Sequence, residues 1–146
     1  MASYSRLKVF LSFLVFGIIL GVVENIIAIS LATSHPLNLE AFIVSFLVVI
    51  PFAALGELIV DRNPLIPHAT SGWWLHIEVF LEFLVFGVVM GVVEDLIVIT
   101  LLTGEPITMQ IVWIVFLVTL PFAILGELIV DRAQWFVWLK EHTSLR

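Results

Sequence analysis

Long apolar stretches separated by short polar gaps dominate the pattern along this chain. Four of the stretches are long enough to cross a bilayer, because about 20 helical residues span the roughly 30 Å hydrocarbon layer. They run from Val9 to Ala32, from Ala41 to Val60, from Val79 to Leu102 and from Ile111 to Val130. The pattern therefore predicts an all-α membrane protein, with four transmembrane helices in a single transmembrane domain over residues 1–146.

The second half of the chain repeats the first. At an offset of 70 positions and without a gap, residues 7–62 align with residues 77–132, and about 31 of the 56 positions are identical. Each copy holds two spans, an even number, so both copies enter the membrane from the same side. We expect two tandem helical hairpins in parallel orientation, related by a pseudo-two-fold axis along the membrane normal. An interfacial C-terminal tail over residues 133–146, forming an amphipathic turn or helix, would follow them.

The basic residues predict the orientation of the chain. Cytoplasmic loops of membrane proteins are enriched in Lys and Arg. Here every basic residue lies at the N-terminus, in the middle loop or at the C-terminus: Arg6, Lys8, Arg62, Arg132, Lys140 and Arg146. We therefore expect a multi-pass integral membrane protein with both termini in the cytoplasm. The first apolar run lacks a cleavage site of small residues, so we expect it to be retained as an anchor.

The composition excludes several classes of protein. With 62% hydrophobic and 12% charged residues, the chain has too little polar surface to coat a water-soluble domain. The net charge of -6, without a dense basic cluster, argues against nucleic acid as a partner. The absence of cysteine excludes disulfides and thiolate metal sites. All four histidines lie in loops or at span ends, which argues against a b-type haem with paired axial histidines.

Glycines indicate how the helices pack. Gly17 and Gly21 form a GxxxG step in the first span, and Gly87 and Gly91 repeat it in the third. Small residues let helix backbones approach closely, and Glu24 falls on the same stripe as its two glycines. We expect the first and third helices to cross at these glycines and to bring the glutamates of the two copies near each other. The plainer interpretation is a generic packing face.

The deepest ionisable residues are Glu24 and Glu94, roughly 5 Å to the outer side of the midplane by helical rise. A charge at such a depth costs at least about 2.5–3.5 kcal/mol. No Lys, Arg or His lies within a span, so the two carboxyls must be protonated, hydrogen-bonded, hydrated or bound to a cation. Asn25 and Asp95 follow them, and we expect Asn25 to donate a hydrogen bond toward Asp95. The plainer interpretation is a pair of protonated glutamates that link close helices.

A second acidic layer lies roughly 15 Å closer to the cytoplasm. It consists of Glu57 with Asp61, and of their copies Glu127 with Asp131, spaced i, i+4 so that each pair shares a helix face. The alternative interpretation is that this GELIVDR segment closes a helix at the cytoplasm, with Arg62 pairing with Asp61.

These patterns favour a small transporter or channel for a divalent metal ion or a proton. The cation-binding residues would be Glu24, Glu94, Asn25 and Asp95 at the centre, and Glu57, Asp61, Glu127 and Asp131 at the mouth. Glu24 and Glu94 are the candidate metal ligands for a bound divalent cation, and no other cofactor is indicated.

The alternative is a non-catalytic accessory or assembly subunit of a larger membrane complex. An enzyme using paired carboxylates is a weaker third class, and we expect no catalysis. The expected partners are the lipid bilayer and either further copies of the chain or other membrane subunits.

Overall fold

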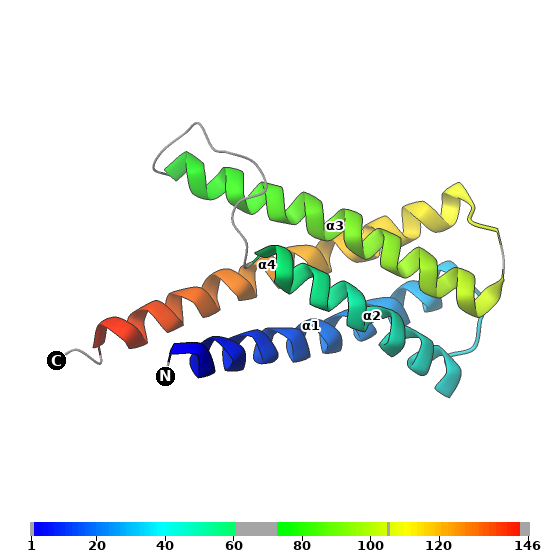
Figure 1. Cartoon of the computed structure of the whole chain (residues 1–146). Helices are drawn as coiled ribbons and strands as arrows, with labels where there is room; N and C mark the ends of the chain where they lie inside the picture. Colours follow the sequence, from blue (N-terminus) through cyan, green and yellow to red (C-terminus); the bar gives the residue numbers. More distant parts are fainter. Residues whose placement is uncertain (1, 61–72, 105, 144–146) are drawn as a thin grey trace.

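The computed structural model of the chain contains four helices, which account for nearly all of the part it describes (Figure 1). That part comprises residues 2–60, 73–104 and 106–143, and side-chain surroundings are described for residues 10–56, 58–59, 77–104 and 106–129. The helices are α1 (Ala2–Ala32), α2 (Leu39–Val60), α3 (Trp73–Thr103) and α4 (Met109–Thr143). All four are long and apolar enough to cross a membrane. This confirms the prediction of a multi-pass, all-helical membrane protein.

Local polar residues set the bounds of the helices at the two short turns. The Asn38 side chain accepts a hydrogen bond from the Ala41 amide at 3.0 Å and so caps the start of α2. Thr108 does the same for the Ile111 amide at 3.3 Å, at the start of α4. Gly104 has a φ of 63°, the left-handed conformation that commonly ends a helix, and it follows the last residue of α3.

The two hairpins turn at the same end of the bundle. In Figure 1 the α1–α2 and α3–α4 connections lie together at one end, which we call the turn end, while the start of α1 and the end of α4 lie at the opposite, terminal end. α1 and α3 contact each other, and each also contacts both α2 and α4. Within the described residues α2 and α4 do not contact each other. The bundle is therefore built around the α1–α3 pair.

The C-terminal tail does not form an element of its own up to Thr143. α4 continues as one helix from Met109 to Thr143, so residues 133–143 are helical, which is one of the two forms that we expected, while their place at the membrane interface stays a prediction. The physical reason is that residues 131–143 contain neither proline nor glycine to end the helix. The side chains of this last part lie outside the described surroundings.

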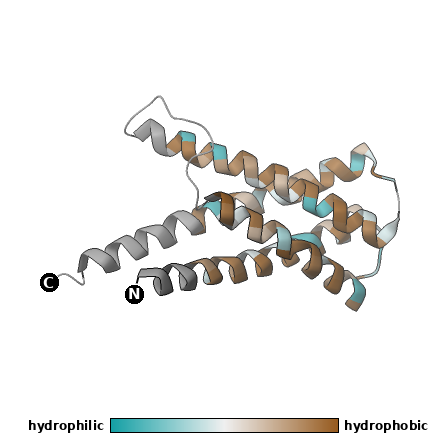
Figure 2. Ribbon diagram, viewed as in Figure 1, coloured by the Kyte–Doolittle hydropathy of each residue, from teal (hydrophilic) through white to brown (hydrophobic). Residues whose placement is uncertain are grey.

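The outward surface of the bundle is apolar, as a bilayer requires. Along α1, every fourth residue from Leu11 to Leu31 is exposed, and each of these is a large hydrophobic: Leu11, Val15, Ile19, Val23, Ile27 and Leu31. Along α3, every fourth residue is likewise an exposed large hydrophobic: Leu81, Val85, Val89, Val93, Ile97 and Leu101. Figure 2 shows the hydrophobic colour over most of the length of the coloured parts of all four helices. Such stripes are stable against lipid tails and would be unfavourable against water.

Tight packing is confined to the half of the bundle nearest the turn end. Every described residue that is buried lies within positions 25–49 or 95–119. The hydrophobic core in this half is a cluster of aliphatic side chains: Ala28, Ile29, Ala41, Val98, Ile99, Ile111, Val115 and Val118. Toward the terminal end the same four helices pack more loosely, which leaves room for a cavity.

Candidate cation site

Glycines bring the two helices of each hairpin into close contact. A Cβ placed on Gly17 would lie 3.6 Å from the Ala53 Cβ, and one placed on Gly87 would lie 3.6 Å from the Ala123 Cβ. Gly17 and Gly87 therefore face α2 and α4, so for these two glycines the prediction of a place at the crossing of the first and third helices is wrong. The reason is that the short turns fold each helix directly against its neighbour in sequence, so the small residues face that neighbour first.

One turn further along, glycines make room for carboxyl groups from the opposite hairpin. The Glu24 Oε1 atom lies 3.1 Å from a Cβ placed on Gly91, and the Glu94 Oε1 atom lies 3.4 Å from one placed on Gly21. Each glutamate thus reaches across the α1–α3 contact to the glycine of the other helix. The structure therefore brings Glu24 and Glu94 close together, as expected, although it does so through side chains that cross between the helices.

Two neutral donors hold this group of carboxyls. The Asn25 Nδ2 atom donates a hydrogen bond to Glu94 Oε1 at 2.9 Å. The Thr119 hydroxyl donates to Asp95 Oδ2 at 3.2 Å and is within hydrogen-bonding reach of Glu24 as well. The prediction that Asn25 donates a hydrogen bond toward Asp95 is therefore wrong, because the acceptor is Glu94. Asp95 is turned toward α4, whereas the longer Glu94 side chain reaches α1.

Sequence reasoning missed Thr119, which has the same place in α4 as Val49 in α2. The difference between the copies at this position, a hydroxyl in place of a methyl group, was the available signal. Thr119 lies beside the three carboxyls and Asn25. We call this group of five residues the carboxyl cluster: Glu24, Asn25, Glu94, Asp95 and Thr119.

Burial differs within the carboxyl cluster. Asn25, Asp95 and Thr119 are each only 1% exposed, whereas Glu24 and Glu94 are half-buried. One oxygen of Glu24, Oε1, is buried and has no hydrogen-bond partner in the described structure. The described spans contain no Lys, Arg or His. No basic side chain of those spans can therefore neutralise the three carboxyls.

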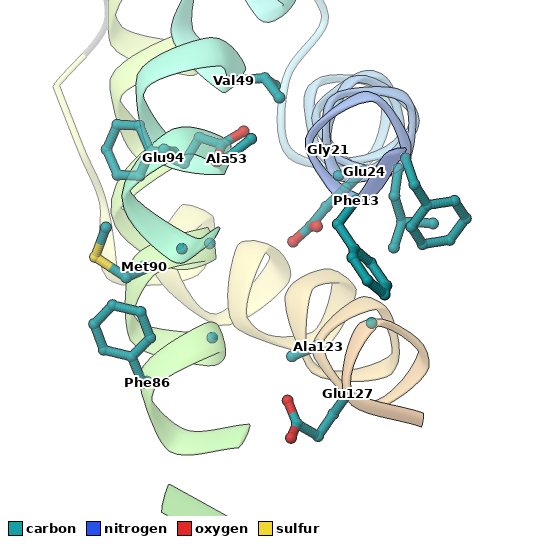
Figure 3. Close-up of a pocket in the computed structure, with 18 of the residues that line it drawn as sticks. Phe13, Gly21, Glu24, Val49, Ala53, Phe86, Met90, Glu94, Ala123 and Glu127 are labelled. Atoms are coloured by element: carbon teal, nitrogen blue, oxygen red, sulfur yellow. The ribbon is translucent and has the colours of Figure 1, made fainter. Parts of the chain in front are cut away.

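The half-buried glutamates line a cavity of about 230 Å³ between the helices (Figure 3). It extends from Glu24 and Glu94 toward the terminal end, where Glu127 of α4 lines it. In Figure 3 the carboxyls of Glu24 and Glu127 point from α1 and α4 into the space between the helices. The rest of the lining is glycine or apolar: Phe13, Phe16, Gly17, Leu20, Gly21, Val49, Phe52, Ala53, Gly56, Phe83, Phe86, Gly87, Met90, Gly91, Ala123 and Gly126.

The predicted second acidic layer is described only in part. Glu127 lines the cavity, on the side of the terminal end from the carboxyl cluster. Asp61 and the side chains of Glu57 and Asp131 lie outside the described residues. Among the described residues, no three acidic or histidine side chains are arranged to hold a metal ion.

A second cavity, of about 260 Å³, lies at the turn end. It is formed by the turn after α1 and the last residues of α3, and its lining is largely polar: Thr33, Ser34, His35, Pro36, Leu102 and Thr103. The buried aliphatic core occupies the part of the bundle between this cavity and the carboxyl cluster. The two cavities therefore lie on opposite sides of the packed region.

Comparison of the chain with protein-family models, with curated proteins and with solved structures gave no match.

Proposed function

We propose that the protein is a small membrane transporter or channel for a cation, either a divalent metal ion or a proton. Glu24 and Glu94 bind the cation, with Asn25 and Asp95 beside them. One observation carries this proposal. Three carboxyls without a basic partner in the described spans gather at one end of a cavity between the helices, and two of them line its wall.

The energetics of the cluster support a cation as its ligand. Carboxyls buried together repel one another when ionised, and burial in an apolar bundle adds to this cost. A proton or a hard metal cation removes the cost by neutralising the group, and carboxylate oxygens are the ligands that such cations prefer. Asn25 and Thr119 supply only neutral hydrogen bonds, which leave the net negative charge of ionised carboxyls in place.

The uneven packing of the bundle supports transport over simple binding. The cavity extends from the carboxyl cluster toward the terminal end, while the core around Ile29 and Ile99 packs the side toward the turn end. A cation bound at the cluster would leave by the turn end only when this core opens. Closure on one side of a central site is the arrangement that alternating access requires.

The proposal includes the symmetry and the orientation of the chain. The two hairpins are related by a pseudo-two-fold axis along the membrane normal, and both termini lie in the cytoplasm. The cavity then opens toward the cytoplasm, and Glu57, Asp61, Glu127 and Asp131 form its acidic mouth. Such a mouth would raise the local concentration of cations at the cavity.

A flux assay on purified protein in liposomes tests the proposal. With a panel of divalent cations and, separately, a pH gradient, the wild-type protein should move one of these ions, and the Glu24→Gln/Glu94→Gln variant should reduce the rate at least tenfold. Glu40→Gln is the matched control, because Glu40 is an exposed glutamate at the start of α2, outside the cavity. Flux should remain at the wild-type rate in this control.

The accessory-subunit alternative predicts another outcome. Wild-type protein would then move no cation in liposomes, and it would copurify from its native membrane in a fixed ratio with other membrane chains. That result would overturn the transport proposal.

A further inference from the structure

Two buried polar atoms on the α1–α2 contact have no hydrogen-bond partner within the described protein. They are the side-chain oxygen Oδ1 of Asn25 and the hydroxyl oxygen of Ser45. Asn25 is 1% exposed and Ser45 is 0% exposed. Buried polar groups are nearly always paired, because an unpaired one loses its hydrogen bonds to water without gaining any in the protein. Two such groups on one helix contact therefore indicate a ligand.

The register of the two helices places these residues opposite each other. Gly17 faces Ala53, and Gly21 faces Val49. Because the helices are antiparallel, moving four residues forward in α1 corresponds to moving four residues back in α2. The next step pairs position 25 with position 45. Asn25 and Ser45 therefore share one level of the antiparallel contact, on the same faces as the glycine contacts.

The second hairpin has the same register but a different pair. Its glycine contacts, at positions 87 with 123 and 91 with 119, place Asp95 opposite Val115. There Asp95 is paired with the Thr119 hydroxyl, and Val115 is packed in the aliphatic core. Serine has one non-hydrogen side-chain atom fewer than valine. The nearest glycine contact is 2.9 Å in the first hairpin and 2.6 Å in the second, so the helices of the first hairpin are at least as far apart there. We therefore expect the smaller serine to leave room for about one methyl group, close to the size of one water molecule.

We propose that a water molecule binds between α1 and α2, donating a hydrogen bond to Asn25 Oδ1 and accepting one from the Ser45 hydroxyl. Water fits because Asn25 Oδ1 can only accept, while the serine hydroxyl can donate. The bound water fixes the Asn25 amide with its nitrogen toward Glu94, the orientation in which it donates to that carboxyl. The water is therefore a structural part of the carboxyl cluster, in hairpin 1 alone.

The water site also indicates through which hairpin the proposed cation path continues toward the turn end, and this step rests on the proposed function. Among the described residues, the buried polar side chains are Asn25, Ser45, Asp95 and Thr119. Ser45 is one turn closer to the turn end than Val49, and Val115 has the corresponding place in hairpin 2. The polar path from the cluster toward the turn end thus continues through hairpin 1 and stops at Val115 in hairpin 2.

A crystal structure of the full chain in a lipid phase, at about 2 Å resolution, tests the water site directly. Density for one atom should lie within hydrogen-bonding distance, about 2.7–3.2 Å, of both Asn25 Oδ1 and Ser45 Oγ. No such density should lie between Asp95 and Val115. A direct hydrogen bond from Ser45 to Asn25, or from Ser45 to the Ala41 carbonyl, without density between the helices, would overturn the proposal.

The sign of a stability change gives a second test. Ser45→Val, which copies hairpin 2, displaces the water and leaves Asn25 Oδ1 unpaired, so the melting temperature in detergent should fall by about 4 °C or more. In a dry contact the same change removes an unpaired hydroxyl and fills space, so the melting temperature would rise and the proposal would fail. Ser30→Val is the matched control, because Ser30 is exposed on α1, and it should change the melting temperature little.

Ser45→Ala keeps the test decisive if the valine variant does not fold. It removes the hydroxyl but leaves room for the water on Asn25, so a smaller fall is expected, whereas a dry contact predicts no change or a rise. In the flux assay, Ser45→Val should slow transport at least fivefold. If wild-type protein moves no cation, the proposed function fails, while the density and the melting temperatures still decide the water site.

Discussion

At the scale of single residues, some of the differences between the two copies lie directly beside the carboxyls. Asn25 in α1 stands at the position of Asp95 in α3, and its amide donates to Glu94 at 2.9 Å. An aspartate at position 25 would meet the Glu94 carboxyl with another carboxyl at hydrogen-bonding distance. The asparagine therefore both supplies a donor and limits the cluster to three carboxyls.

Asn25→Asp should destabilise the protein, and more strongly as the pH rises. The substitution replaces a hydrogen bond with repulsion between carboxyls, which is present only when both are ionised. We expect a loss of about 1–3 kcal/mol at pH 8, and a smaller loss at pH 5. Thermal unfolding in detergent at the two pH values measures this.

Asp95→Asn is the matched control for that prediction. It removes one carboxyl from the cluster, keeps an oxygen that accepts from Thr119, and should leave stability at pH 8 unchanged or increased. If Asn25→Asp is equally stable at both pH values, its amide does not serve to limit repulsion.

At the scale of helices, the glycines differ in how close their neighbours lie. A Cβ at position 17 would be in ordinary contact with Ala53, at 3.6 Å. One at position 91 would lie 2.6 Å from a methyl carbon of Thr119 and 3.1 Å from a Glu24 oxygen. The space beside Gly91 is therefore already filled by two residues of the carboxyl cluster, whereas Gly17 has room for a methyl group.

Gly91→Ala should destabilise the bundle by about 1–3 kcal/mol, because Thr119 and Glu24 must move to admit the new methyl group. Gly17→Ala should be neutral or stabilising by up to about 1 kcal/mol, since alanine favours the helix and nothing is displaced. Melting temperatures of the two variants in the same detergent test the pair. Equal effects would show that the glycine contacts are wrongly placed.

At the scale of the whole molecule, a chain of 146 residues builds a closed half and an open half from the same four helices. The buried aliphatic side chains gather at the turn end, and the cavity extends toward the terminal end. The proposed direction of access thus depends on which end faces the cytoplasm.

We expect a reporter fused after Arg146 to be active in the cytoplasm, because all the Lys and Arg residues lie in segments assigned to that side. The chain has no cysteine, so a single Ser34→Cys substitution in the turn after α1 can report the other side. A membrane-impermeant maleimide added to intact cells should label it. An external signal from the fusion, together with protection of position 34, would invert the orientation.

The sequence by itself determined the class of fold and the candidate residues for the site. Four apolar runs of membrane length can satisfy their backbone hydrogen bonds in a bilayer only as helices, so their number and approximate bounds followed from the pattern. Glu24, Glu94, Asn25 and Asp95 stood out because polar groups are costly at that depth. For such features the local sequence and the solvent suffice.

Only the tertiary structure decided which residues meet. Gly17 and Gly87 face the neighbouring helix of their own hairpin, whereas Gly21 and Gly91 also meet a glutamate of the other. Asn25 donates to Glu94 in place of Asp95, and Thr119 joins the cluster from α4. The cavity, and the level of Asn25 opposite Ser45 on which the proposed water site rests, depend likewise on the register of α1 against α2. A periodic pattern gives the face of each helix but not its rotation or register against its neighbours, because those are set by side-chain packing between distant segments.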